Sequence, residues 1–216
     1  TVPDESTILR FRHLLERHQL TAQIFDAVKA LLEEQRLLLK AGTIVDATII
    51  GAPSSTKNAT QTRDPEMKQT RKGNQWYFGM KLHIGTDRRG LVHSLTTTDA
   101  AAADITQLPH LLHGAETTLH GDKAYYKADD KLHWELSGGR YLVNKSGRRT
   151  PHWDAINATR SRTRARVEHA FHVIKRLWGF AKVRYRGLAK NTVRAYAACA
   201  LANLYLVRHR LVPQGT

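Results

Sequence analysis

Apolar residues recur at helical spacing near both ends of the chain. Between about residues 5 and 39 they predict two helices, with Thr21 as the N-cap of the second. Near the C-terminus, one apolar stripe predicts a helix through Glu168, and an almost wholly apolar run predicts a last helix over 192–207, capped by Asn191. The stripe beside Glu168 consists of Val167, Ala170, Phe171, Ile174, Leu177 and Trp178.

The middle of the chain is rich in β-branched residues and is interrupted by turn signals. Five strands are expected, at residues 43–50, 76–85, 91–98, 117–122 and 140–144. The second and third form a hairpin, and helices at about 104–112 and 127–136 lie between the last three strands. The segment between residues 51 and 74 has no regular pattern and is predicted to be a long basic loop.

The order of these elements is a helical segment, a strand, a hairpin, a helix, a strand, a helix, a strand and two long helices. Three antiparallel strands followed by alternating helices and strands resemble the ribonuclease H-like fold of retroviral-integrase type. We therefore expect an α/β fold in which helices flank a mixed five-stranded sheet, with a short N-terminal helical appendage. A chain of 216 residues with 41% hydrophobic content can bury one sizeable core.

Charge points to the class of partner. The chain has 34 Lys and Arg residues against 19 acids, a formal net charge of +15, and the excess is spread over its whole length. Such a balance favours a polyanion, and nucleic acid in particular, as the partner. The single Cys199 excludes a disulfide framework and a cysteine zinc site. Without a membrane-spanning run or a signal-peptide pattern, we expect a soluble intracellular protein with no membrane partner.

Three acids occupy places where a structural role is unusual. Asp46 interrupts a β-branched strand, and Asp122 ends the fourth predicted strand. In a ribonuclease H-like sheet the first and fourth strands are neighbours, so both carboxylates can reach a shared ion, which Glu168 completes. Oxygen ligands of this kind suit Mg²⁺ or Mn²⁺, and two such ions catalyse phosphoryl displacement. The alternative is a set of structural ion pairs, because a Glu four residues after an Arg is typical of a solvated helix surface.

Several motifs resemble DDE transposases of the bacterial insertion-sequence-five family. The similarity runs from near Thr1 to about Leu206 and includes Gly42 to Thr48 and Gly121 to Tyr125, which contain the two aspartates. The C-terminal signature is represented by Arg164 to His169, Ile174 to Arg176, Gly179-Phe180, Arg184 to Leu188 and Ala202 to Leu204. The family pattern has a Tyr three residues before the first Arg of this signature, where this chain has Ser161.

This resemblance implies a function and a set of site residues. Asp46, Asp122 and Glu168 would be the catalytic, metal-binding triad, and Arg164 and Lys175 the basic companions of the glutamate. The expected reaction is metal-dependent cleavage of double-stranded DNA at transposon ends, followed by transfer of the 3′-hydroxyl into target DNA. The expected setting is a homodimer or larger assembly on DNA, in the nucleoid of a bacterial cytoplasm.

The resemblance also divides the chain. Residues 1–41 would be the remnant of an N-terminal helical region that helps to recognise transposon ends, and residues 42–210 the ribonuclease H-like catalytic domain. Much of the N-terminal region is expected to be lacking. Two alternatives therefore stay open, a truncated transposase-derived protein that binds DNA without catalysis and a simple metal-dependent nuclease without strand transfer.

Basic residues surround the predicted site. Arg164 shares the predicted helical face of Glu168 and is expected to hold the scissile phosphate or to orient the carboxylate, and Lys175 is expected to reach a neighbouring phosphate. The remaining candidates for contacts to the DNA backbone are Arg160, Arg162, Arg166, Lys182, Arg184 and Arg186. A further basic cluster, with Lys72, lies in the predicted long loop. For each of these cations, simple surface solvation is the alternative.

Overall fold

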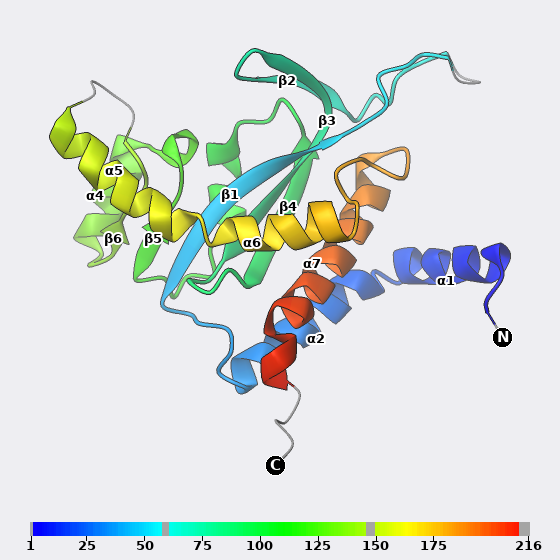
Figure 1. Ribbon diagram of the computed structural model, residues 1–216, viewed down its shortest axis with the longest axis horizontal. Coiled ribbons are helices and arrows are strands. Elements are labelled where there is room, and N and C mark those ends of the chain that lie inside the picture. The colour runs from blue at the N-terminus through cyan, green and yellow to red at the C-terminus, as the bar shows by residue number, and fades with distance from the viewer. Residues whose placement is uncertain (1, 58–60, 146–149, 212–216) are drawn as a thin grey trace.

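The computed structural model describes residues 2–57, 61–145 and 150–211 and has a mixed α/β architecture with a curled sheet (Figure 1). The strands are β1 (Gly42–Gly51), β2 (Lys68–Lys72), β3 (Gln75–Thr86), β4 (Val92–Asp99), β5 (Thr118–His120) and β6 (Arg140–Tyr141). Their hydrogen-bonded order is β2-β3-β1-β5-β6. β4 lies off this path and also pairs with β3. Pairing is parallel between β1 and β5 and between β5 and β6, and antiparallel elsewhere. This mixed sheet flanked by helices is compatible with a ribonuclease H-like fold.

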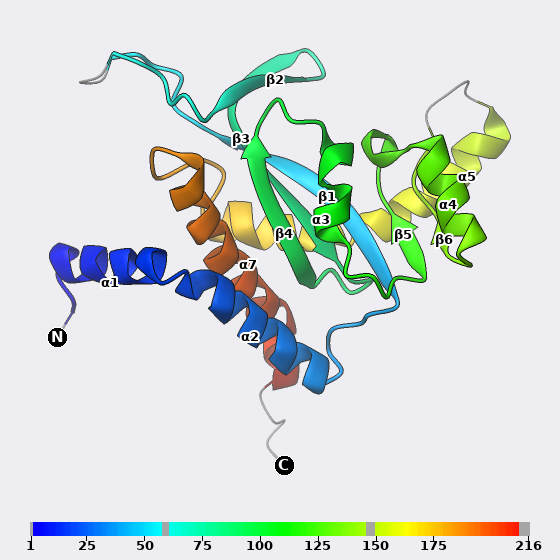
Figure 2. The same cartoon turned by 180° about the vertical axis from the view of Figure 1, so that it is seen from behind.

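Helices cover both faces of the sheet. They are α1 (Glu5–Arg17), α2 (Leu20–Glu34), α3 (Leu108–Leu111), α4 (Ala128–Leu136), α5 (Pro151–Arg164), α6 (Val167–His172) and α7 (Leu188–Leu211), with short turns η1 (Asp104–Gln107), η2 (Lys123–Tyr125) and the π-helical η3 (Val173–Leu177). Figure 1 shows α5 and α6 crossing in front of β1, and Figure 2 shows α3 and α4 on the opposite side. None of the helices in the described part of the chain is both long and apolar enough to cross a bilayer.

The sheet has one strand more than the sequence predicts. β2 lies within the predicted loop over 51–74 and pairs with the first half of β3, from Lys68 opposite Gly79 to Lys72 opposite Gln75. Its residues are polar and mostly exposed, so the strand forms through backbone pairing across a tight turn at Gly73 rather than through an apolar face. Residues 58–60 of the predicted loop lie outside the described residues.

The two faces of β1 pack against different parts of the core. Ile44 and Ile50 belong to a cluster with the buried residues of α6, η3 and α7. Val45, on the opposite face, belongs to a second cluster, which contains Leu108, Leu111, Leu119, Tyr125, Tyr141 and Val143. Because side chains alternate along a strand, Asp46 and Thr48 lie on the same face as Ile44 and point towards α5, α6 and η3.

The N-terminal helices differ in how they are held. α2 contributes Phe25 and Leu32 to the core and lies along α7 (Figure 2). α1 buries no residue, and its apolar side chains Ile8 and Phe11 are each 58% exposed. The predicted apolar stripe of the first helix is therefore present but uncovered by the described part of the chain.

Two predicted helix caps are wrong. α2 begins at Leu20, after Gln19 in the left-handed region, so Thr21 is a buried helical residue rather than an N-cap. α7 begins at Leu188, so Asn191 lies within its first turn. The Asn191 side chain instead donates to the carbonyls of Tyr185 and Gly187 at 2.7 Å each, and thereby holds the preceding loop against the helix.

Candidate active site

The pairing of β1 with β5 brings the two candidate aspartates together. Gly42 lies opposite Thr118, and Ile44 lies opposite His120. Two residues further along, the same register reaches Asp46 on β1 and Asp122 just beyond the end of β5. The predicted adjacency of the first and fourth predicted strands is therefore confirmed, and Asp122 lies close enough to Asp46 to raise its pKa.

Asp46 is buried and paired. It is 9% exposed, its Oδ2 accepts a hydrogen bond from Nη1 of Arg164 at 2.6 Å, and its Oδ1 accepts from the backbone N–H of Ala47 at 2.8 Å. Burial raises the pKa of Asp46 to about 6, because loss of water outweighs the stabilisation of the carboxylate by Arg164 and by the Ala47 N–H. The neighbouring carboxylates of Asp122 and Glu168 raise this pKa further.

Asp122 is oriented by the chain that follows it. It is the N-cap of η2, and its Oδ1 accepts a hydrogen bond from the backbone N–H of Ala124 at 2.8 Å. The next element is anchored by Tyr125, which is fully buried in the second core cluster. A capping bond to a rigid turn therefore fixes the direction of a half-buried carboxylate beside Asp46.

Glu168 lies in the first turn of α6, on the exposed side of that helix. Val167, Ala170 and Ile174 are fully buried beneath it, and Phe171 is 6% exposed. The predicted apolar stripe is confirmed at these four positions, whereas Leu177 is 49% exposed because η3 widens before it. The packed side of α6 thus fixes the backbone that carries Glu168.

The predicted single helix through Arg164 and Glu168 is wrong. α5 ends at Arg164 and α6 begins at Val167, and the junction is tightened by bonds over three residues, from the N–H of Arg166 to the carbonyl of Thr163 and from the N–H of Glu168 to the carbonyl of Ala165. A tighter turn rotates the side chains before it relative to those after it. Arg164, at the end of α5, donates to Asp46, and Glu168 in α6 also lies close enough to Asp46 to affect its pKa.

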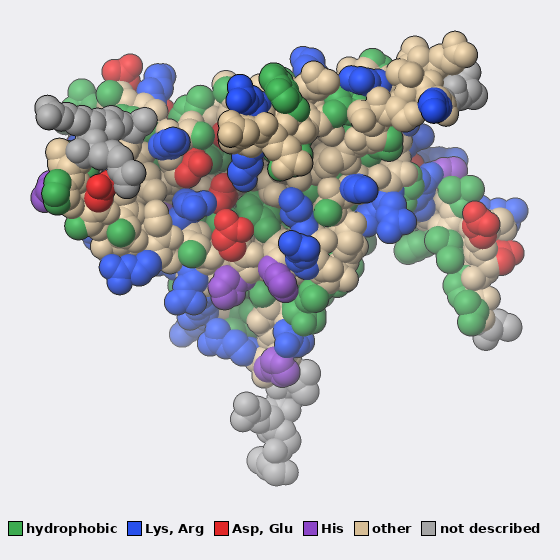
Figure 3. Space-filling model, turned by 45° about the horizontal axis from the view of Figure 1, so that its top comes forward, with side chains coloured by type: hydrophobic (Ala, Val, Ile, Leu, Met, Phe, Trp, Pro, Cys, Tyr) green, Lys and Arg blue, Asp and Glu red, His purple; other side chains and the backbone are tan. Residues whose placement is uncertain are grey.

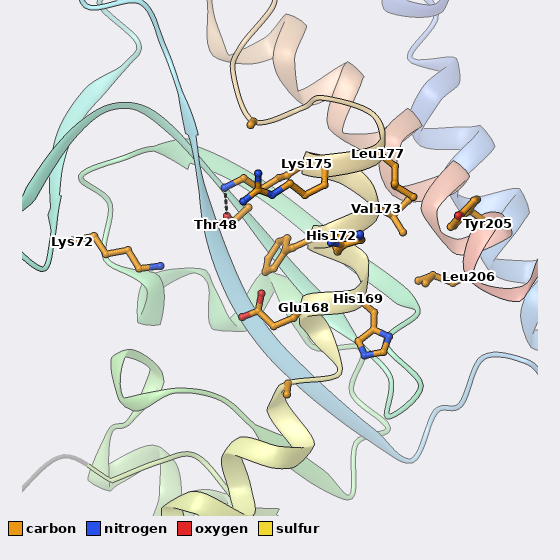
Figure 4. A pocket seen from close by; sticks show the side chains of 14 residues that line it. Thr48, Lys72, Glu168, His169, His172, Val173, Lys175, Leu177, Tyr205 and Leu206 are labelled. Atoms are coloured by element: carbon orange, nitrogen blue, oxygen red, sulfur yellow. Dashed lines mark hydrogen bonds between the residues drawn. The ribbon is translucent and has the colours of Figure 1, made fainter.

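An open groove of about 1090 Å³ runs along α6 and η3 beside Glu168 (Figure 4). Glu168 and Lys175 point to the same side, over β1, whereas His169 points away on the other side of the helix. The Nζ atom of Lys175 donates to Oγ1 of Thr48 at 2.9 Å and to the carbonyl of Ile49 at 3.1 Å. Burial lowers the pKa of Lys175, as do the nearby cations of Lys72 and Arg176, while Glu168 raises it.

Thr48 and Lys72 line the groove as well, and neither was among the candidates for the catalytic site. Thr48 lies two residues after Asp46, so strand alternation alone places it on the same face, and that signal could have identified it. Lys72 comes from β2 and reaches the groove from the opposite side (Figure 4). Its charge was visible in the sequence, but its position depends on the strand that the sequence did not predict.

The donor chemistry of the three acids fits a hard divalent cation. Their oxygen atoms are the ligands that Mg²⁺ and Mn²⁺ prefer. In the described part of the chain, no three His, Cys, Asp or Glu side chains are arranged to hold a metal ion. Arg164 supplies the positive charge next to Asp46, and its buried Nε atom has no hydrogen-bond partner among the described residues. The three carboxylates are therefore suited to a metal by their chemistry, and in this structure Asp46 is paired with the guanidinium of Arg164 instead.

The other residues predicted to contact DNA differ in their exposure and in their hydrogen-bond partners. Arg160 donates from Nη1 to the carbonyl of Val143 at 2.6 Å, and Arg186 donates to Oγ1 of Thr62 at 3.1 Å. Arg162, Arg166, Lys182 and Arg184 are exposed. Figure 3 shows Lys and Arg side chains spread over the face in view, with a few acidic side chains set among them.

Fold and site together define the class of protein. A family model described as a transposase DDE domain matches residues 38–204. Because the match covers most of the chain, the chain belongs to the DDE transposase domain family. Membership implies nuclease or transposition chemistry and DNA binding in general, and domains of this family generally use divalent metals. A search of the solved structures finds no match.

Proposed function

We propose that the chain is a transposase of the insertion-sequence-five type with a ribonuclease H-like catalytic domain. Its reaction is hydrolysis of a phosphodiester bond at each transposon end, followed by attack of the freed 3′-hydroxyl on target DNA. The observation that carries the proposal is the register of β1 and β5, which sets Asp46 beside Asp122 with Glu168 in electrostatic range. A structural role would not require three acids to gather beside a basic groove.

Asp46, Asp122 and Glu168 would hold Mg²⁺ or Mn²⁺, as a pair of ions. When bound, such ions activate an attacking oxygen and stabilise the leaving one. Asp46 contributes a buried carboxylate that Arg164 keeps ionised and oriented, because the guanidinium offsets part of the cost of burial. Asp122 contributes a carboxylate fixed by its capping bond, and Glu168 one fixed by the packing of α6.

The basic residues of the groove, of the α5–α6 junction and of the segment after η3 hold the DNA backbone. Lys175, Arg162 and Arg166 are the proposed phosphate contacts nearest to the acids, and Lys182, Arg184 and Arg186 extend the surface beyond η3. Arg160 acts indirectly, by fixing the backbone at Val143. Assembly as a dimer or larger complex on DNA, and a division into a helical region over 1–41 and a catalytic domain over 42–210, belong to the same proposal.

Asp122→Asn tests the catalytic part. The change keeps the shape and the capping oxygen but removes the charge, so we expect loss of Mg²⁺-dependent cleavage of duplex DNA with unchanged DNA affinity. Cleavage is measured on gels with labelled transposon-end duplexes, and joined products with a target plasmid separate strand transfer from simple nuclease action. Full-rate cleavage by the variant would overturn the assignment.

One observation favours a second candidate, a protein that binds DNA without catalysis. Arg164 already pairs with Asp46, and the described acids form no closed metal cluster. A calorimetric titration with Mn²⁺ in the presence of duplex DNA distinguishes the two. Uptake of Mn²⁺ that disappears in Asp122→Asn supports the transposase, whereas no uptake by the native chain supports the binding protein.

A further inference from the structure

A second hollow lies behind the junction of α5 and α6. It has a volume of about 420 Å³ and is lined by Arg88, Arg162, Thr163 and Arg166. Ala165 lines the groove beside Glu168, while the next residue, Arg166, lines this hollow. The two spaces are therefore separated by little more than the backbone of the junction, and the hollow belongs to the immediate surroundings of the candidate active site.

Arg88 reaches this place because the turn between β3 and β4 packs against the helix junction. The turn has Gly90 at φ 85°, and a Cβ atom added there would lie 2.6 Å from the carbonyl oxygen of Arg166. Asp87 secures the turn by accepting the backbone N–H groups of Arg89 and Leu91. Only a glycine allows the turn to approach the backbone of Arg166 so closely. This approach brings Arg88, from the turn between two strands, to the hollow that Arg162 and Arg166 also line.

Three of the four residues that line this hollow are arginines, and none of the four is an acid. In the part of the chain that the structure describes, no Asp or Glu lies within ion-pair distance of Arg88, Arg162 or Arg166. The buried ring of His120, which interacts electrostatically with Arg88, adds no negative charge. Like charges around one hollow repel each other, and an anion in the hollow would offset that repulsion.

We propose that Arg88, Arg162 and Arg166, with Thr163, form a binding pocket for a backbone phosphate of the DNA. A guanidinium group has only hydrogen-bond donors, and a hydroxyl group can donate as well. This lining therefore matches the acceptor oxygens of a phosphate. The pocket holds the strand on the far side of the α5–α6 junction from Glu168, and so fixes the register of DNA at the acids. DNA as the ligand rests on the proposed function, whereas the anion pocket rests on the geometry alone.

The test measures DNA affinity of the double variant Arg88→Gln/Arg166→Gln. A labelled duplex is titrated by fluorescence anisotropy at several salt concentrations without divalent ions, in the Asp122→Asn background so that no cleavage occurs. We expect an affinity loss of about tenfold or more, and a slope of log K against log salt that is smaller by about 0.9, as for one lost phosphate contact. Thermal unfolding without DNA should occur at an unchanged or higher temperature, because repulsion is relieved.

The control is Lys127→Gln/Lys131→Gln, which removes the same charge at α4, where both side chains are exposed and away from the groove. This control should lose much less affinity and keep its salt slope. Equal losses in the two double variants would overturn the pocket, since they would reflect net charge alone. Failure of this proposal can be told apart from failure of the proposed function. Absence of cleavage by the native chain would refute the proposed chemistry. A specific loss of DNA affinity in Arg88→Gln/Arg166→Gln would still support the anion pocket.

Discussion

At the scale of single residues, the contact between Arg164 and Asp46 governs the candidate site. A carboxylate that is 9% exposed keeps its charge near neutral pH only with a close cation, and the 2.6 Å bond from Arg164 supplies one. The same contact occupies an oxygen atom that a metal would use. Arg164 and the proposed metal ion would therefore compete for the same carboxylate.

In the absence of divalent ions, Arg164→Gln should destabilise the protein. Loss of the guanidinium leaves a buried carboxylate unpaired, so the free energy of unfolding should fall by about 1–3 kcal/mol at neutral pH. The loss should shrink below about pH 6, the pKa of Asp46, because a protonated carboxyl needs no cation.

Urea denaturation at several pH values measures this difference. Arg162→Gln is the control, since this exposed arginine has no acidic partner among the described residues, and its effect should stay within about 0.5 kcal/mol. Equal effects of the two changes would show that the pairing of Arg164 with Asp46 does not stabilise the fold.

The positions of the candidate acids could be predicted from the sequence better than their contacts. The offset between Asp46 and Asp122 equals the register of β1 on β5, because Asp46 lies within β1, Asp122 follows β5, and the two strands pair in parallel. The bond from Arg164 to Asp46 could not be predicted, since it depends on the packing of α5 against β1, and the turn at Ala165 and Arg166 carries no Gly or Pro signal. For Arg88, the sequence indicates a positive charge but not where in the fold that charge lies.

At the scale of elements, α5 and α6 differ in how many of their side chains are buried in the core. α5 has no buried residue, whereas α6 places Val167, Ala170 and Phe171 in the core. The five predicted strands are all present, because β-branched runs and turn residues identify buried strands well. β2 was missed, because a polar strand held by backbone pairing has no side-chain periodicity.

Val167→Ala should impair catalysis more than its effect on stability alone would suggest. Val167 is fully buried next to Glu168, and removal of two methyl groups lets α6 shift, at a cost of about 1–3 kcal/mol. Val207→Ala, in a different core cluster at the end of α7, is the matched control with a similar stability loss. Cleavage rates under folding conditions should fall several-fold for Val167→Ala and remain unchanged for Val207→Ala. Equal rates would refute the positioning role of α6.

At the scale of the whole molecule, a strongly basic chain folds around buried neutral histidines. His93 is 5% exposed, its Nε2 atom lies 3.1 Å from Oγ1 of Thr43, and its Nδ1 atom lies 3.0 Å from Oγ of Ser94. Burial lowers the pKa of His93 to about 4; His113 also lowers it and Glu116 raises it. Such a molecule gains further positive charge on acidification and has buried rings that resist protonation.

Stability should therefore decrease in mild acid. Because the folded pKa of His93 lies below the unfolded value of about 6.5, its contribution is present above about pH 6.5 and is lost as the pH falls towards 4. At about pH 5 the loss should reach at most about 2 kcal/mol relative to neutral pH. His93→Gln, which cannot gain a proton, should show a flatter dependence in urea unfolding curves. An identical pH dependence of the two proteins would contradict this origin.

The central claim is that Asp46, Asp122 and Glu168 act as one divalent-metal catalytic site. The most direct measurement compares Mg²⁺-dependent cleavage of a duplex DNA by Asp46→Asn, Asp122→Asn and Glu168→Gln, with Asp129→Asn, at an exposed position of α4, as control. The account predicts that each of the three loses about 100-fold or more in rate, with DNA affinity retained, and that the control keeps the native rate. Cleavage at the native rate by any one of the three variants would contradict it.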